Sequence, residues 1–327
     1  MSLDLVIPAH EKDIDTLNIC IDYARKNIID LNNIYVVSRN KLTDNAIWVS
    51  EDIFPFKLED IAKKIGKHRK TCWYYAGIIQ TTAAIFIPNL KKYVLIMDSD
   101  TIIIKPVKFL EDNISLFNIS PSDGLPCYYE HAFKLIPSLN RQHLWSGVCH
   151  HILINREILE DLFKRVESIH NKPFWEAYID VTLEPYKTLK EYTYKDVIGK
   201  HGHGQGRLTS YELYFTFALQ YHSDKVKIRK LNSIMAYKGW IGLDGYELSH
   251  PSRTNFKKGS NIQIIPISEE INFNFNNIDE ALRYISDRCS YEGYDMVTYQ
   301  NHTRIGSLGN SKINTEYINR VCNDNLK

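Results

Sequence analysis

The segment Tyr93–Met97 is an unbroken run of five apolar side chains, followed directly by Asp98, Ser99 and Asp100. Such a run is typical of a strand buried in an α/β sheet. Because side chains along a strand alternate faces, Asp98 and Asp100 should point one way and Ser99 the other. In open α/β sheets the carboxyl end of a strand faces the ligand crevice. The pattern therefore predicts a divalent cation bridging to phosphate oxygens. The alternative is a solvated turn after a core strand.

Strand and helix signals alternate along the chain, which favours an α/β fold. No internal repeat is evident, and the Asn-rich run 272–277 resembles a connector. Asn277 is a candidate N-cap for the last predicted helix. Strands are expected at 3–8, 33–38, 93–97, 101–104, 152–154 and 226–231, the last closing the core, and helices at 13–30, 68–87, 156–169, 173–185, 209–221 and 279–289.

Composition excludes several classes of function. Forty basic and 39 acidic residues give a net charge of +1, so no overall field recruits nucleic acid or an anionic membrane. No apolar run approaches the roughly 20 residues that span a bilayer, and the first strand begins too early for a secretion signal. The six cysteines are widely spaced, which predicts reduced, buried thiols. These features predict a cytoplasmic protein without membrane insertion.

The motif Asp98-Ser99-Asp100, between its apolar strand and the short run 101–106, resembles that of nucleotide-sugar-dependent glycosyltransferases of the GT-A fold. The resemblance covers roughly residues 3–240 and implies a Rossmann-like central mixed sheet flanked by helices. It implies that Asp98 and Asp100 hold Mn²⁺ or Mg²⁺ against the diphosphate of a UDP-sugar. The implied division is a catalytic domain at 1–250, with a nucleotide-binding half at 1–110 and an acceptor-side half at 111–250, and a small C-terminal subdomain at 251–327.

The resemblance also implies a donor-binding surface around the motif. Segment 3–10 is similar to the first strand of that fold, whose following loop cradles the nucleobase and ribose. Segment 34–39 is similar to the second strand, and 73–80 to the helix before the motif. Ser146 and Gly147 are expected to bring backbone close to the donor sugar. The implied donor-binding residues are Pro8, Ala9, His10, Ser38, Arg39, Tyr75, Gln80, Asp98, Ser99, Asp100, Ser146 and Gly147.

Two carboxylates are candidates for the acceptor side. Glu212 is flanked by aromatic residues in the segment 210–215, a combination that suits the C–H faces and hydroxyls of a sugar and resembles a segment of some bacterial and viral glycosyltransferases. The alternative is an N-capped helix in which Glu212 favours the dipole. Asp180 is the second candidate, with a helix-surface acid as the alternative. Either carboxylate could act as the base of an inverting reaction.

Histidines are expected to complete the metal site, since imidazole suits Mn²⁺ better than Mg²⁺. His250, in a turn-rich loop, is the favoured third ligand. His302 is the alternative, whereas His222 ends a helix and is expected to interact with its dipole. The glycine-rich segment 201–207 is interpreted as an active-site loop or a surface linker. The pair His150-His151 is ambiguous, because only one of the two can face the site from a strand.

The resulting hypothesis is a metal-dependent enzyme that moves a hexose from UDP-glucose to a glycan or glycoprotein, with retention of configuration. The chain is similar to soluble glycosyltransferases of giant DNA viruses, and its Asn, Ile, Lys and Tyr richness fits such genomes. This implies a host-cytoplasmic enzyme acting on galactosyl-hydroxylysine of collagen-like proteins. Two alternatives stay open: a non-catalytic nucleotide-sugar or glycan-binding module, and a metal-dependent nucleotidyltransferase. No Walker-type phosphate loop favours the latter. The sequence does not specify an oligomeric state.

Overall fold

A computed structural model describes residues 2–65, 71–120, 126–188, 210–229, 231–237, 278–291 and 293–300. Its strands are β1 (Leu3–Pro8), β2 (Leu31–Ser38), β3 (Ile47–Ser50), β4 (Tyr93–Met97), β5 (Thr101–Ile103), β6 (Leu110–Glu111), β7 (Ile114–Phe117), β8 (His151–Asn155), β9 (Val226–Ile228), β10 (Ser233–Tyr237) and β11 (Met296–Gln300). The α-helices are α1 (Ile14–Asn27), α2 (Leu58–Ile65), α3 (Thr71–Phe86), α4 (Pro126–Leu135), α5 (Arg156–His170), α6 (Phe174–Thr188), α8 (Tyr211–Tyr221) and α10 (Ile278–Tyr291).

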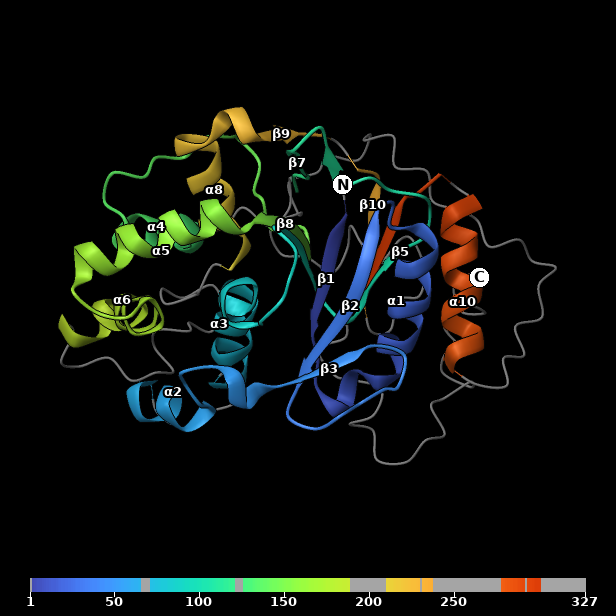
Figure 1. Ribbon diagram of the computed structural model, residues 1–327, viewed down its shortest axis with the longest axis horizontal. Coiled ribbons are helices and arrows are strands. Elements are labelled where there is room, and N and C mark those ends of the chain that lie inside the picture. The colour runs from blue at the N-terminus through green and yellow to red at the C-terminus, as the bar shows by residue number, and fades with distance from the viewer. Residues whose placement is uncertain are drawn as a thin grey trace, which may run out of the picture.

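The central sheet has the order β3-β2-β1-β4-β8. The first four of these strands are parallel, and β8 runs antiparallel to β4. Every residue of β4 is buried, because β1 and β8 pair with its two edges while helices cover both faces of the sheet (Figure 1). The expectation of a central mixed sheet flanked by helices is confirmed.

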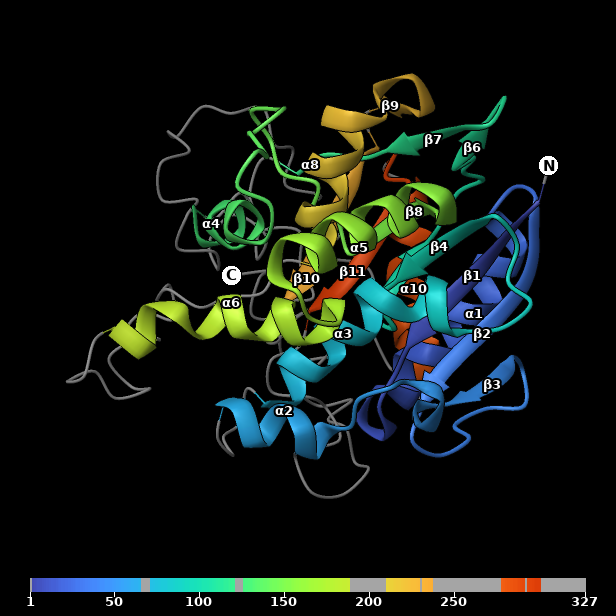
Figure 2. The same ribbon diagram turned by 60° about the vertical axis from the view of Figure 1, so that its left-hand side comes forward.

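Alternation along β1 separates the two faces of the sheet. Leu5 and Ile7 pack in a cluster with Leu17 and Ile21 of α1, whereas Val6 belongs to the cluster on the opposite face. That opposite cluster is larger and includes side chains of α3, α5, α6 and α8, which lie together on one side of the central sheet (Figures 1 and 2). Successive apolar side chains of β1 therefore pack into two separate cores, one on each face of the sheet.

The C-terminal elements pack against the N-terminal half. In a second sheet of order β10-β11-β5, β11 runs antiparallel to β5, which directly follows the acidic motif. Helix α10 lies beside α1 (Figure 1), and a third cluster joins Leu282 and Val297 to Ile19 and Ile102. The described part of 251–327 therefore shares a core with residues of the predicted nucleotide-binding half. The domain division itself stays a prediction.

Some sequence expectations need correction. Strand β9 ends at Ile228 and pairs with β7 in a third sheet of order β6-β7-β9, so it does not extend the central sheet. Cys72 is exposed, contrary to the expectation of buried thiols, whereas Cys20 and Cys149 are buried. Strand β3 and helices α2 and α4 lie where no element was expected. None of the described helices is long and apolar enough to cross a bilayer.

Candidate active site around Asp98

The acidic motif lies in a tight turn between β4 and β5. The Thr101 N–H donates to the Asp98 carbonyl at 3.1 Å, so residues 98–101 close a turn. The strand-alternation argument therefore does not apply to Asp98 and Asp100, because β4 ends at Met97. The turn follows the carboxyl end of β4, where the loops after the parallel strands β1 and β2 also begin. This is the edge at which open α/β sheets bind ligands.

Three side chains from three parts of the chain hold Asp98. Its Oδ1 accepts hydrogen bonds from Gln80 Nε2 at 2.6 Å and from the Tyr211 hydroxyl at 2.5 Å. Its Oδ2 lies 3.0 Å from His150 Nδ1. A carboxylate has about four lone-pair positions, so these contacts occupy both positions on Oδ1 and one on Oδ2. Among the described residues, no hydrogen bond to the second position on Oδ2 is seen.

The second carboxylate of the motif, Asp100, has a raised pKa. Desolvation and the negative charge of Asp98 raise the pKa of Asp100 to about 7, although His150 opposes the shift. Asp13 adds a further negative charge. Two carboxylates placed together at a strand end repel each other, and a bound cation relieves that repulsion.

The loop after β1 reaches the motif. His10 precedes the short helix Glu11–Asp13, and its backbone N–H donates to Asp13 Oδ2 at 3.1 Å. The Asp13 side chain also hydrogen-bonds Ser99, and its pKa is raised, mainly by burial. Pro8 and Ala9 are partly buried, whereas His10 is exposed. Asp13 thus links the loop after β1 to the acidic motif, a contact that the sequence did not predict.

The loop after β2 lies beside the first loop. Asn40 Nδ2 donates to Glu11 Oε1 at 2.8 Å, which joins the two loops. Ser38 is buried and donates to the Asn40 carbonyl, whereas Arg39 is exposed. Tyr75 does not contact Asp98 in the described hydrogen bonds; its hydroxyl pairs with Glu51, whose pKa is raised by burial. Whether these residues bind a donor stays a prediction.

The predicted acceptor carboxylates are engaged elsewhere. Glu212 is 1% exposed, and its pKa is raised by burial despite hydrogen bonds from Ser146, Gly147 and Thr216. Asp180 forms ion pairs with Lys64 at 2.8 Å and Lys172 at 2.7 Å. Burial alone would raise the pKa of Asp180, but the two ammonium groups lower it. Neither carboxylate is hydrogen-bonded to a residue of the acidic motif in the described structure.

Three residues at the site were not singled out as ligand-binding: Asp13, His150 and Tyr211. His150 has a positive φ of 61°, and no pattern in the neighbouring sequence predicts this left-handed backbone. In the pair His150-His151, His150 contacts Asp98 and His151 contacts Asn118. The alternation argument does not apply to the pair, because β8 begins at His151 and His150 lies outside the strand. Tyr211 adjoins Glu212, so the segment that the sequence singled out contacts Asp98 through the neighbouring side chain. The predicted ligands His250 and His302, and the segment 201–207, lie outside the described residues.

The two carboxylates of the motif fit a divalent cation. Within the described ranges no three His, Cys, Asp or Glu side chains are grouped to hold a metal ion. Mg²⁺, however, is commonly bound through one or two carboxylates, with substrate phosphates and water completing the coordination. The hard oxygen donors of Asp98 and Asp100 meet that requirement.

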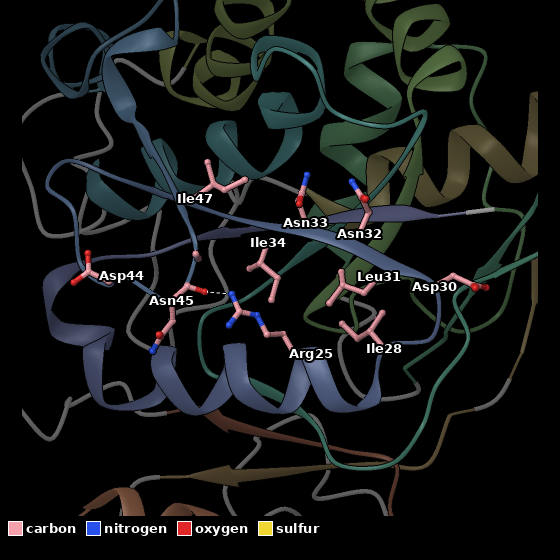
Figure 3. A pocket seen from close by; sticks show the side chains of 11 residues that line it. Arg25, Ile28, Asp30, Leu31, Asn32, Asn33, Ile34, Asp44, Asn45 and Ile47 are labelled. Atoms are coloured by element: carbon pink, nitrogen blue, oxygen red, sulfur yellow. Dashed lines mark hydrogen bonds between the residues drawn. The ribbon is translucent and has the colours of Figure 1, made fainter.

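A separate pocket of about 540 Å³ lies between α1 and the strands β2 and β3 (Figure 3). Arg25 bridges it by donating to the Asn45 carbonyl, and Asn32 and Asn33 of β2 line its rim. Asn32 and Asn33 belong to the amino-terminal half of β2, and Asn45 precedes β3, whereas the acidic motif follows the carboxyl end of β4. The pocket is therefore distinct from the site around Asp98.

No model of a known protein family matches the chain, and no curated protein matches it in sequence. Among solved structures the chain is similar to the galactosyltransferase LgtC in complex with donor and acceptor sugar analogs, with 10% identity, a TM-score of 0.41, and coverage of 98% of this chain and 96% of that one. Mouse xyloside xylosyltransferase 1 gives 9% identity and a TM-score of 0.35 over 72% of this chain and 87% of that one. The WbbM bifunctional glycosyltransferase gives 12% identity and a TM-score of 0.41 over 98% of this chain and 51% of that one.

Proposed function

We propose that this chain is a glycosyltransferase that uses a UDP-sugar and a divalent cation. The observation that carries the proposal is the turn at Asp98–Thr101, which places two carboxylates together at the ligand-binding edge of a parallel sheet. Desolvation and the negative charge of Asp98 raise the pKa of Asp100, so the two carboxylates interact electrostatically. The motif also resembles that of UDP-sugar enzymes, as the sequence indicated.

In this proposal Asp98 and Asp100 bind the cation, which supplies positive charge to the leaving diphosphate. Gln80 and Tyr211 hold Asp98 in one rotamer by donating to Oδ1. His150 fixes Oδ2 from the other side. Holding a ligand rigidly by a surrounding set of hydrogen bonds is how metal sites keep their geometry. These three residues are therefore positioning residues for the carboxylate.

The finer assignments rest on the sequence resemblance. The proposed donor is UDP-glucose, the proposed acceptor is a glycan or glycoprotein such as galactosyl-hydroxylysine of a collagen-like protein, and retention of configuration is the proposed outcome. A cytoplasmic location and Mn²⁺ with His250 as a further ligand belong to the same set. NMR of the newly formed glycosidic linkage would separate retention from inversion.

The decisive experiment is a panel of UDP-sugars assayed for UDP release with Mn²⁺, with Mg²⁺ and with EDTA. Cation-dependent UDP release from at least one sugar is the expected result. A nucleotidyltransferase would instead consume nucleoside triphosphates and release pyrophosphate, which the same samples can be assayed for. Binding of UDP-sugars without turnover, with or without an acceptor, would favour the non-catalytic binding module.

A further inference from the structure

The first turn of α8 contacts three separate parts of the chain. Ser210 Oγ donates to Gln80 Oε1 at 3.0 Å, and the Tyr211 hydroxyl donates to Asp98 Oδ1. The next residue, Glu212, reaches Ser146 and Gly147, which precede β8. One helical turn thus supports both Asp98 and the segment that leads to His150.

The Glu212 carboxylate acts as a buried acceptor of three hydrogen bonds. Its Oε2 accepts from Ser146 Oγ at 2.5 Å and from the Gly147 N–H at 2.8 Å. Its Oε1 accepts from Thr216 Oγ1 at 2.9 Å, one turn further along α8. Because the residue is 1% exposed, these donors replace the water that a carboxylate otherwise binds.

Phe215 lies against the backbone of Gly147. A Cβ added to Gly147 would lie 2.3 Å from Phe215 Cγ, so only glycine allows the backbone to approach α8 this closely. The Ser146 backbone also pairs with Ser120, with N–O distances of 2.8 and 3.1 Å. Glu212 and Phe215, three residues apart on one helix face, therefore fix the Ser146–Gly147 backbone from two sides.

This anchor lies close in sequence to two features of functional interest. Downstream, His150 contacts the Asp98 carboxylate, and its carbonyl accepts from the Asp98 N–H at 2.9 Å. Upstream, Leu144 and Trp145 are 76% and 40% exposed. Gly147 and His150 are three residues apart, so the backbone between them spans at most about 11 Å.

We propose that Glu212 is a positioning residue: it anchors Ser146 and Gly147 on α8 and thereby holds His150 against Asp98. This role rests on the proposed function of the Asp98 site and replaces direct contact between Glu212 and the acceptor. Its requirement is a hydrogen-bond acceptor at this place, whereas a catalytic base requires an ionisable carboxylate. The two roles make opposite predictions for glutamine.

In Glu212→Gln the amide oxygen can still accept from Ser146 and the Gly147 N–H, while the amide nitrogen donates to the Thr216 hydroxyl. UDP release from the UDP-sugar should then stay within about threefold of wild type, whereas loss of a general base costs about 100-fold or more. Glu212→Ala removes the anchor, and displacement of His150 should lower turnover by about 100-fold. Glu157→Gln, at an exposed carboxylate paired with Lys92, is the matched control for the charge change.

Hydrogen exchange gives a readout that does not depend on turnover. The Gly147 amide should stay protected in wild type and in Glu212→Gln, and should lose protection in Glu212→Ala while α5 and β4 keep theirs. Gly147→Ala, which leaves Glu212 intact but forces the backbone away from Phe215, should reproduce the loss of protection and the fall in turnover. The effects of Glu212→Ala and Gly147→Ala should be non-additive in the double variant, because both act on one contact.

Loss of turnover in Glu212→Gln with full protection of Gly147 would overturn the proposal and return Glu212 to the role of a base. Unchanged Gly147 protection in Glu212→Ala would overturn it as well. A wild-type protein that releases no UDP from any donor would refute the proposed function, while the exchange data would still show whether Glu212 anchors the loop.

Discussion

At the scale of single residues, the site depends on how Asp98 and Asp100 share a small space. Asp98 is fixed by neighbours that donate to it, whereas Asp100 has its pKa raised to about 7 by desolvation and by the charge of Asp98. Asp98 is therefore held in position, and the proposed cation would offset the repulsion between the two carboxylates. Ligand binding at such a pair should be visible in stability as well as in activity.

Replacing either carboxylate should abolish cation dependence. Asp98→Asn and Asp100→Asn keep side-chain volume but remove an anionic ligand, so UDP release should be lost. Mn²⁺ at 100 times its Kd should stabilise wild type by about 2.7 kcal/mol, and neither variant. Asp44→Asn, at a surface aspartate paired with Lys41, is the control. Equal Mn²⁺-induced shifts in melting temperature for wild type and both variants would contradict the metal assignment.

The backbone at His150 gives a second residue-scale prediction. Its φ of 61° is in the left-handed region, which asparagine tolerates and β-branched residues do not. His150→Val should lower the free energy of unfolding by about 1–2 kcal/mol more than His150→Asn. Urea unfolding of the two variants measures the difference. Equal stability would show that the backbone relaxes at this position.

At the scale of elements, ion pairs join α2 to α6. They engage the carboxylate of Asp180, which was one of the two candidates for a catalytic base. Lys64 of α2 pairs with Asp180 and lies 3.6 Å from Glu176, both of α6. Lys64 Nζ also lies 5.7 Å from the centre of the Trp175 ring. Because Asp180 forms ion pairs with two lysines, its contacts favour a structural role between helices. This agrees with the alternative interpretation of Asp180 as an acid on a helix surface.

Asp180→Asn should therefore lower stability by only about 0.5–1 kcal/mol, the usual size for a partly exposed ion pair, and leave UDP release unchanged. Because its folded-state pKa is lowered, its contribution is present above the unfolded pKa of 3.8 and is lost as the pH falls below that value. Thermal melting at pH 7 and a turnover assay measure both effects. A large loss of turnover with normal melting would restore Asp180 as a catalytic candidate.

At the scale of the whole molecule, the C-terminal elements complete a core that begins at the N-terminus. Ile102 and Ile19 are fully buried, and Leu282 of α10 and Val297 of β11 pack against them. Tyr23 of α1 donates to Asp287 at 2.8 Å. The region next to the acidic motif thus depends on residues nearly 200 positions further along the chain.

A chain that ends at residue 277 lacks α10 and β11 and should lose stability, because it exposes Ile19 and Ile102 and leaves the edge of β5 unpaired. Burial of a large apolar side chain contributes roughly 1.5–3 kcal/mol, so several such losses should lower the melting temperature markedly. A chain ending at Gln300 is the control, since it keeps both elements. Unchanged melting of the shorter chain would support an independent C-terminal subdomain.

Buried histidine predicts a pH dependence of global stability. Burial lowers the pKa of His131 to about 4, and its Nε2 lies 2.9 Å from the Tyr178 carbonyl. Since the unfolded pKa is 6.5, the unfolded state takes up a proton first as the pH falls. Stability is fully retained above pH 6.5 and declines by up to roughly 3 kcal/mol toward pH 4. His131→Gln should show a weaker decline than wild type in urea unfolding at pH 7, 6 and 5; identical declines would contradict this.

The sequence by itself determined the elements whose local patterns are strong. The apolar run 93–97 became β4, and the segments near 3–8, 156–169 and 209–221 formed as expected, because burial on both faces or amphipathic periodicity fixes strands and helices locally. It also singled out the two carboxylates of the candidate site, Asp98 and Asp100. The short elements β3, α2 and α4 were missed, because each is shorter than the window of 11 or more residues over which periodicity is usually recognised.

Tertiary structure alone decided which side chains surround Asp98. Tyr211 is 113 residues from Asp98 in sequence, and His150 is 52 residues away with a left-handed backbone that no motif signals. It also decided that Glu212 is buried against Ser146 and Gly147, because aromatic neighbours in a helix do not reveal which face is covered. Local sequence specifies elements and their end residues, whereas contacts between distant segments are fixed only when the sheet and helices pack.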